Sequence, residues 1–376
     1  MSKPKNYLSS ITIKNKKYQF PTYLPDATLG VVRNLSSIDV KKTGIEGVVI
    51  NTYHLRNTPG VEILENADGI KKFMNWNGLT ASDSGGFQLF SLILKNPNLG
   101  KVTDDGVVLY SGEKKRKKTL FTPEKSIQIQ FAIGADIMIC LDDFTPDAAA
   151  LKRIKKSVDR TITWAKRCKA EFKKQIKKRK LTAKNRPLLF AVIQGHRNWE
   201  LREKCAEELL KIGFDGYGLG GWPFNDEGNF DYEMAERNAK LTPDNLPRFA
   251  LGIGSPQNIV ELFKMGYHIF DCVLPTRDAR HQRLYIFNKD PKKIDVLNDQ
   301  TGDKQNWYEH LYIGKGKFKN DFTPISEHCD CFACQNYTKA YLHHLFKVKD
   351  GLAWHLASIH NLKFYFEVIK KLRDSL

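Results

Sequence analysis

The sequence lacks the features of membrane proteins and of disulfide-rich secreted proteins. Its longest apolar runs, such as residues 137–141 and 187–193, are far shorter than the roughly 20 residues that a membrane helix needs. The opening residues, Met-Ser-Lys-Pro-Lys-Asn-Tyr, contain no apolar stretch of the kind found in secretory signal peptides. Cysteine is scarce, with 7 in 376 residues, and an odd number does not suit a disulfide framework. We therefore expect a soluble, cytoplasmic protein without a membrane partner.

Acidic residues are outnumbered by basic ones, 42 against 60, which leaves a formal net charge of +18. Residues 151–186 contain 16 of the basic residues and only two acidic ones. Within this stretch Ile154, Val158, Ile162 and Ala165 recur at helical spacing, which predicts one or two amphipathic helices with a basic outer face. Such a face favours a polyanionic partner, nucleic acid above all, although an ordinary solvated helix would carry the same residues.

Short apolar runs, each followed by polar or glycine residues, alternate with helical patterns such as 126–133 and 198–212. Strand and helix alternation of this kind predicts a parallel sheet. The runs are 48–51, 78–82, 136–141, 188–193, 216–219, 249–251 and 267–270. Polar residues at the end of every run favour a (β/α)₈ barrel, a TIM barrel of the α/β class, over a doubly wound sheet, whose site lies at one switch point.

The pattern changes after residue 280, which divides the chain into two predicted parts. Residues 1–280 form the barrel. Residues 281–328 are polar, aromatic and basic without a clear period, and a cysteine cluster and a helical stretch, 341–376, follow. We expect residues 281–376 to form a zinc-binding subdomain together with C-terminal helices that complete the barrel.

Three cysteines with the spacing Cys-x-Cys-x-x-Cys predict a metal site. Cys329, Cys331 and Cys334 can bring three thiolates to one tetrahedral ion, and zinc is favoured because no fourth cysteine lies nearby for an iron–sulfur cluster. With four protein ligands the site would be closed, and the zinc ion would be structural. The candidates for the fourth ligand are His328, His343, His344, His355 and His360.

Three acids, Asp83, Asp142 and Asp271, stand at the ends of predicted strands. Carboxylates on one face of a barrel suit retaining glycosyl transfer, in which one acts as the nucleophile and another moves the proton of the leaving group. A single such aspartate would more often cap a helix or pair with an arginine. A metal-dependent hydrolase is disfavoured, because the clustered metal ligands lie outside the predicted barrel.

Several motifs, taken together, resemble one family. They are Ala-Ser-Asp-Ser-Gly-Gly-Phe-Gln (81–88), Leu-Asp-Asp-Phe-Thr-Pro (141–146), Ile-Gln-Gly (193–195), Gly-Leu-Gly-Gly (218–221), Phe-Asp-Cys-Val-Leu-Pro-Thr-Arg (270–277) and the cysteine cluster. In this order they resemble the bacterial tRNA-guanine transglycosylases, the queuine tRNA-ribosyltransferase family, from about residue 10 onward. The resemblance implies a zinc-bearing barrel and a pentosyltransferase, usually a homodimer, in queuosine biosynthesis. Its members exchange the wobble guanine of tRNAs with a GUN anticodon for a 7-deazaguanine base.

The resemblance also implies residue roles. Asp271 corresponds to the nucleophile that forms a covalent aspartyl-ribosyl intermediate, Asp83 to the proton acceptor and donor, and His360 to the fourth zinc ligand. The base-binding positions are Asp83, Ser84, Gly85, Gly86, Phe87, Asp142, Gln194, Gly220 and Gly221. The tRNA-binding positions are Gly252, Ile253, Gly254, Ser255, Pro256, Gln257, Asn258, Thr276, Arg277, Asp278, Ala279 and Arg280.

The chain departs from the family pattern beside the predicted base pocket. Phe87 stands where a tyrosine is common, Phe144 where a cysteine is common, and Trp222-Pro-Phe224 where Leu-Ala-Val is usual. The expected incoming base is the pre-queuosine base, 7-aminomethyl-7-deazaguanine, because bulky side chains leave no obvious room for the cyclopentenediol of queuine. Queuine remains the alternative base, and the alternative functions are a non-catalytic tRNA-binding subunit and an enzyme that modifies DNA.

Overall fold

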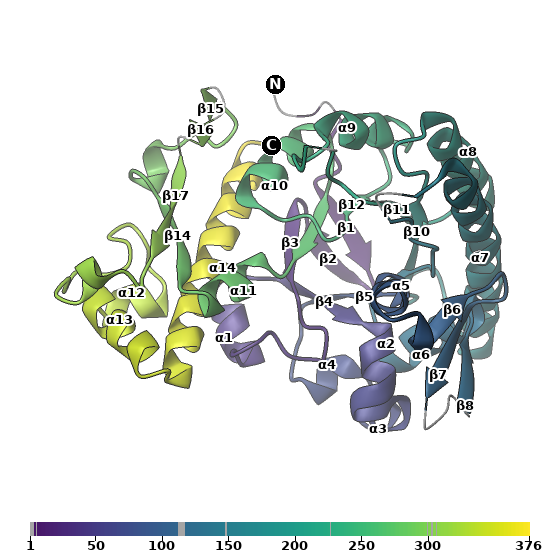
Figure 1. Cartoon of the computed structure of the whole chain (residues 1–376), viewed down its shortest axis with the longest axis horizontal. Coiled ribbons are helices and arrows are strands. Elements are labelled where there is room, and N and C mark those ends of the chain that lie inside the picture. The colour runs from purple at the N-terminus through teal and green to yellow at the C-terminus, as the bar shows by residue number, and fades with distance from the viewer. Residues whose placement is uncertain are drawn as a thin grey trace.

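The computed structural model describes residues 4, 6–111, 117–146, 149–225, 227–298, 300–301, 304–305 and 307–376. Its centre is one sheet of eight parallel strands in the order β3-β13-β12-β11-β10-β9-β5-β4. The strands are β3 (Thr22–Pro25), β4 (Gly47–Asn51), β5 (Leu79–Asp83), β9 (Ile137–Ile139), β10 (Leu188–Ile193), β11 (Gly216–Leu219), β12 (Arg248–Ala250) and β13 (Ile269–Cys272). A parallel bridge between Asp26 and Val49 brings the two edge strands together, so the sheet curls into a nearly closed barrel (Figure 1). The predicted (β/α)₈ barrel is confirmed.

Helices surround this barrel. They are α1 (Ser37–Lys42), α2 (Thr52–Leu55), α3 (Val61–Asn66), α4 (Ile70–Phe73), α5 (Gly86–Lys95), α6 (Pro123–Ile133), α7 (Leu151–Lys178), α8 (Trp199–Ile212), α9 (Tyr232–Lys240), α10 (Pro256–Lys264) and α11 (Leu274–Arg280). The side chain of Asn198 caps α8 by accepting a hydrogen bond from the backbone N–H of Leu201. In the described ranges, no helix combines the length and the apolar character that crossing a bilayer requires.

Two of the small antiparallel sheets are formed by the barrel part of the chain. The hairpin of β1 (Ser10–Ile13) and β2 (Lys16–Gln19) packs Ile13 and Tyr18 against the apolar side chains inside the barrel, including those of Leu24 and Phe190. A three-stranded sheet of β6 (Gly100–Val102), β7 (Val107–Ser111) and β8 (Lys117–Phe121) lies between α5 and α6 in the chain. Apolar side chains of the barrel strands and of the β1–β2 hairpin therefore fill the barrel interior, and the cavity lies at the carboxyl ends of the strands.

The basic stretch forms a single helix, α7, of 28 residues. Its predicted apolar stripe is buried, because Ile154, Val158, Ile162 and Ala165 are all in the core. Many lysines of the opposite face are exposed. The amphipathic prediction is thus confirmed as one continuous helix.

Residues 281–328 contain strands where the sequence showed no clear period. Strand β14 (Arg283–Phe287) pairs antiparallel with β17 (Tyr308–Tyr312), and the two-residue strands β15 (Gln300–Thr301) and β16 (Lys304–Gln305) lie between them. Packed aromatic rings stabilise this hairpin, among them Trp307 and Tyr308, whose planes are tilted by 54° and whose centroids lie 4.5 Å apart. The alternation was hidden because both faces of the pair carry large apolar side chains, with aromatic rings on one face and Leu284, Ile286 and Leu311 on the other.

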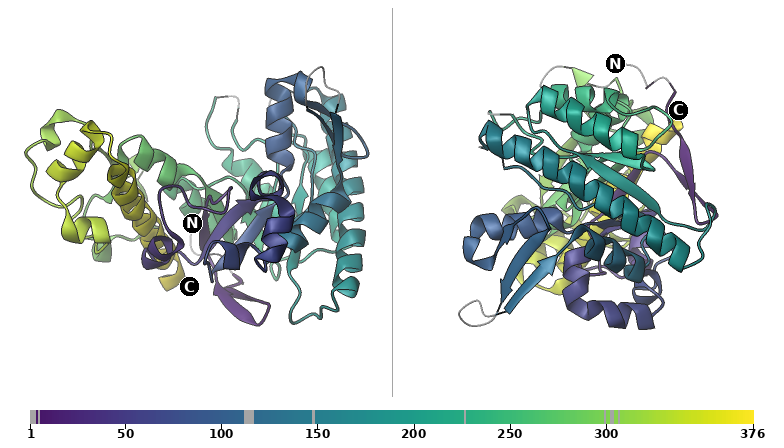
Figure 2. Two further views of the ribbon diagram at one scale, coloured as in Figure 1. Left: turned by 90° about the horizontal axis from the view of Figure 1, so that it is seen from below. Right: turned by 90° about the vertical axis from the view of Figure 1, so that its right-hand side faces the viewer.

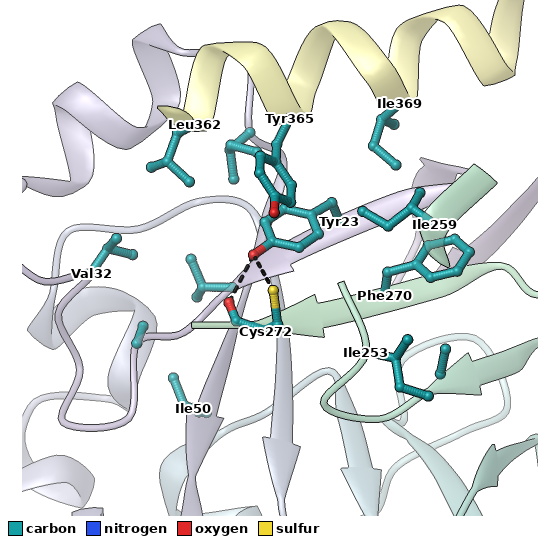
Figure 3. Close-up of a cluster of buried hydrophobic side chains, with 14 of the residues drawn as sticks. Tyr23, Val32, Ile50, Ile253, Ile259, Phe270, Cys272, Leu362, Tyr365 and Ile369 are labelled. Carbon is teal, nitrogen blue, oxygen red and sulfur yellow. Dashed lines mark hydrogen bonds between the residues drawn. The ribbon is translucent and has the colours of Figure 1, made fainter. Parts of the chain in front are cut away.

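The C-terminal helices are α12 (Phe332–Asn336), α13 (Lys339–Lys347) and α14 (Gly351–Asp374). The long helix α14, yellow in Figures 1 and 2, lies between the barrel and the elements around β14, α12 and α13. Figure 3 shows how its Tyr365 packs on Tyr23 of β3, with ring centroids 4.7 Å apart. The Tyr23 hydroxyl donates a hydrogen bond of 2.7 Å to the carbonyl of Cys272, the last residue of β13. Helix α14 therefore supports the neighbouring strands β3 and β13 at the point where β13 ends.

Candidate active site

A cavity of about 290 Å³ opens at the carboxyl ends of the barrel strands, and all eight strands or the turns after them contribute to its wall. Four carboxylates face it, those of Asp26, Asp83, Asp142 and Asp271. Among the other predicted base-binding residues, Phe87, Gln194, Gly220 and Gly221 also line it. Sequence reasoning missed Asp26, Asn51 and Gln88, which belong to the same wall.

Asp83 ends β5 and is held by several donors. The side-chain amide of Asn51, at the end of the paired strand β4, donates a hydrogen bond of 2.9 Å to Asp83 Oδ2. Burial raises the pKa of Asp83 to about 6, and hydrogen bonds from Gln88 and from the backbone of Ser84 and Gly85 oppose this rise. A carboxyl group with this pKa can both release and accept a proton near neutral pH.

The Ser84–Gly86 turn that follows Asp83 requires glycine. Gly85 has a φ of +87°, and a Cβ at this position would lie 2.6 Å from Tyr53 Cβ. A Cβ on Gly86 would lie 3.0 Å from the carbonyl oxygen of Asp142. Gly86 is also the first residue of α5, so this helix begins in close contact with the backbone of Asp142.

Asp142 follows β9 and is coupled to Gln194 at the end of β10. The side-chain amide of Gln194 donates a hydrogen bond of 2.7 Å to Asp142 Oδ2. Burial raises the pKa of Asp142 to about 7, the Gln194 bond lowers it, and the charges of Asp83 and Asp143 raise it further. Gln194 Oε1 is buried without a partner in the part of the chain that the structure describes. It is an acceptor that a ligand with an N–H group could satisfy.

Gly220, after β11, leaves the space in which Gln194 sits. A Cβ here would lie 2.8 Å from Gln194 Nε2 and 2.6 Å from Val192 Cγ1. Both distances are far below van der Waals contact, so a larger residue would displace the amide. The predicted base-binding residues Asp142, Gln194 and Gly220 thus form one contiguous wall across β9, β10 and β11.

The adjacent acid Asp143 has a different role. Its side chain is buried and turned toward α7, where Arg153 donates two hydrogen bonds of 2.6 and 2.9 Å. Arg160 of the same helix pairs with Asp143 as well and, at 2.7 Å, with Asp104. Part of the basic stretch is therefore used to fix the turn that presents Asp142 to the cavity.

Asp271 lies near the end of β13. The backbone N–H of Gly252 donates a hydrogen bond of 2.8 Å to Asp271 Oδ1. Burial raises the pKa of Asp271 to about 7, the Gly252 bond lowers it, and the charges of Asp83 and Asp26 add to the rise. Within the described ranges, Oδ2 has no hydrogen-bond partner, so it is available to a bound molecule. This arrangement suits a carboxylate nucleophile.

The two predicted tRNA-binding segments contain both internal and outward-facing residues. In the first, Ser255 caps α10, and the side chains of Ile253 and Pro256 are buried together with Gly254. In the second, Thr276, Asp278 and Ala279 are buried, and Asp278 accepts hydrogen bonds from Arg283 and Tyr285. The outward-facing residues of these segments are Gly252, Ser255, Gln257, Asn258, Arg277 and Arg280, which are exposed or partly so.

The sequence-predicted metal ligands come together outside the barrel. One ligand atom each from Cys329, Cys331, Cys334 and His360 lies within 4.8 Å of the others. His360 Nε2 donates to the carbonyl of Tyr285 at 2.8 Å, which leaves Nδ1 directed toward the sulfurs, 3.3 Å from Cys334 Sγ. Three thiols and one oriented imidazole fit a tetrahedral ion, so the cluster could bind a metal. The other candidate histidines that sequence reasoning left open do not join this cluster.

Comparison with known proteins identifies the family. The family model described as queuine tRNA-ribosyltransferase matches residues 5–376. A protein named queuine tRNA-ribosyltransferase from Thermoanaerobacter pseudethanolicus is 36% identical over 356 residues, which cover 95% of this chain and 86% of that protein. A protein of the same name from Staphylococcus aureus is 36% identical over 362 residues, which cover 96% of this chain and 86% of that protein. The chain therefore belongs to the queuine tRNA-ribosyltransferase family of glycosyltransferases.

Proposed function

We propose that this protein is a tRNA-guanine transglycosylase. It exchanges the wobble guanine of tRNAs with a GUN anticodon for the pre-queuosine base, through a covalent bond between the ribose and Asp271. The observation that carries the proposal is the placement of Asp83, Asp142 and Asp271 around one cavity, each with different hydrogen-bond partners.

The first step forms the bond between Asp271 and the ribose. The free Oδ2 attacks C1′ while the bond from C1′ to N9 of guanine breaks, and the carboxylate charge stabilises the oxocarbenium character of the transition state. Asp83 gives a proton to the departing guanine. In the second step Asp83 takes a proton from N9 of the incoming base, which then attacks C1′ and releases Asp271. Both carboxyl groups are thereby restored.

The wall across β9, β10 and β11 recognises the purine. Asp142 accepts hydrogen bonds from the N–H groups of the Watson–Crick edge, and the Gln194 amide and the backbone of Gly221 complete the contacts. The unpartnered buried Oε1 of Gln194 supports this role. Phe87 covers the base from α5, where its ring packs edge to face on Phe144 with centroids 5.0 Å apart.

The wall beside Gly221 supports a small substituent at position 7 of the base. On a 7-deazaguanine, position 7 lies on the same side as O6, so a base whose O6 meets Gly221 directs its substituent toward the next residues of the loop. These are Trp222 and Phe224, which line the cavity with ring centroids 5.5 Å apart. An aminomethyl group fits beside two such rings more readily than a cyclopentenediol does, so the pre-queuosine base is favoured over queuine.

The remaining partners follow from the same proposal. Arg277 and Arg280 hold phosphates of the anticodon arm beside the segment 252–258, because guanidinium groups bind phosphate through two hydrogen bonds. Zinc occupies the cluster of three cysteines and His360, where it fastens β14, α12 and α14 together as a structural ion. The enzyme acts in the cytoplasm as a homodimer.

The test is the exchange of radiolabelled guanine into an unmodified tRNA with a GUN anticodon. The wild type and Asp105→Asn, a control at an exposed carboxylate, should incorporate label, and Asp271→Asn should not. Unlabelled pre-queuosine base should compete better than queuine. A folded, tRNA-binding wild type that incorporates no label would refute the proposal in favour of a non-catalytic subunit or a DNA substrate.

A further inference from the structure

The fourth carboxylate of the cavity, that of Asp26, has no role in the chemistry above. It follows β3, the strand that pairs in parallel with β13, and the register of this pair sets Pro25 opposite Cys272. Asp26 is therefore one residue beyond the paired end of β3, beside the strand that carries Asp271. Its charge is close enough to raise the pKa of Asp271.

The order of strands around the barrel divides the cavity into two sides. Asp142, Gln194 and Gly220 follow the adjacent strands β9, β10 and β11. Across the barrel, Asp271 lies on β13 and Asp26 follows β3. A purine whose Watson–Crick edge meets the first side points N9 toward the second. The ribose attached to N9 must then lie over β13 and β3.

We propose that Asp26 binds the 2′-hydroxyl of the nucleotide whose base is exchanged, and that it thereby selects RNA over DNA. This inference rests on the proposed function. The 2′-hydroxyl is bonded to the carbon next to C1′, so a group that binds it must stand beside the nucleophile, as Asp26 does. A carboxylate is a strong acceptor for a hydroxyl donor, and a hydrogen bond at the 2-position strengthens as charge develops on the sugar.

The surroundings of Asp26 leave one oxygen for this contact. The hydroxyl of Thr28, which also lines the cavity, donates to Asp26 Oδ1 and fixes the orientation of the carboxylate. Across the residues that the structure describes, no hydrogen bond reaches Oδ2. Burial and the charge of Arg33 lower the pKa of Arg280, and the negative charge of Asp26 opposes this change. These arginines place positive charge for the flanking phosphates on the same side as the ribose.

The experiment compares two RNAs in two proteins. An anticodon stem-loop carries either guanosine or 2′-deoxyguanosine at the exchanged position, and kcat/KM for guanine exchange is measured with the wild type and with Asp26→Ala. The wild type should prefer the ribonucleotide by about tenfold or more, as expected for a hydrogen bond to a charged group. Asp26→Ala should lose about this factor on the ribonucleotide relative to the deoxynucleotide, so the preference disappears.

Two further variants separate binding from folding. Asp26→Asn keeps an acceptor oxygen and should retain part of the preference, and Thr28→Val should lower it less than Asp26→Ala does. A loss by the same factor on both RNAs, or no loss, would overturn the role of Asp26 and leave the proposed function standing. A wild type that exchanges guanine in neither RNA would overturn the proposed function, and the role of Asp26 with it.

Discussion

Asp271→Asn should abolish exchange and also stabilise the protein, because burial makes the ionised form of the Asp271 carboxylate unfavourable. Burial raises its pKa from 3.8 to about 7 in the folded chain. Asparagine keeps an oxygen that can accept the Gly252 N–H bond, which measures 2.8 Å in the wild type. The substitution therefore removes the charge with little change in shape.

The sign and size follow from proton linkage. Between about pH 4 and pH 7 the folded wild type holds a proton that the unfolded chain has lost, so its stability falls as the pH rises, and the loss is complete above about pH 7. A difference of about 3 pKa units corresponds to roughly 4 kcal/mol at most. Solvent at the mouth of the cavity reduces this value, and we expect a gain of about 1–3 kcal/mol for the variant at pH 8.

The assay is urea unfolding at about pH 5 and pH 8 for the wild type, Asp271→Asn and Asp105→Asn. The free energy of unfolding of Asp271→Asn should exceed that of the wild type, and the gap should widen from the lower pH to the higher. The exposed Asp105→Asn control should show no such widening. A gap that stays constant across this range would mean that Asp271 is already ionised at low pH in the free protein, contrary to the reasoning.

Three other substitutions test separate parts of the structure. Gly220→Ala should displace Gln194, reduce kcat/KM about tenfold or more and destabilise the fold by about 1–3 kcal/mol. Gly351→Ala should do neither, because its new Cβ would meet nothing within 4 Å beyond its chain neighbours and the backbone of its own helix. His360→Ala should lower both the zinc content and the melting temperature, measured by metal analysis and calorimetry, and the exposed His344→Ala should preserve both. Replacing exposed lysines of α7, such as Lys155 and Lys156, by glutamine should weaken tRNA binding and flatten its salt dependence; an unchanged salt slope would make this face a solvated surface only.

The sequence predicted seven of the eight barrel strands but missed β3. Thr22–Pro25 is only four residues long and ends in proline, so it resembles a turn more than a strand. Its place in the barrel depends on pairing with β13, far along the chain, and no local pattern carries that information. The hairpin of β14 and β17 was missed for a related reason, because it is stabilised by ring packing with α14.

The three acids at predicted strand ends do line one cavity, but the sequence did not show which of the residues next to them also face it. Asp142 and Asp143 are consecutive and chemically identical, yet one faces the cavity and the other the arginines of α7. The choice follows from which residue points inward at the end of β9, and that depends on the register of the sheet. Asp26 was missed together with its strand, so the position of the fourth carboxylate needed the structure.

The pairing of β3 with β13 also determines when the chain acquires a complete site during folding. It joins segments almost 250 residues apart, so it is a contact of very high sequence separation and closes slowly. Strands β4 to β12 can assemble earlier, but Asp26 and Asp271 come together only when β3 pairs with β13. A partly folded chain therefore holds Asp142, Gln194 and Gly220 together without Asp271, so under the proposed function it would not cleave a nucleoside before the barrel is closed.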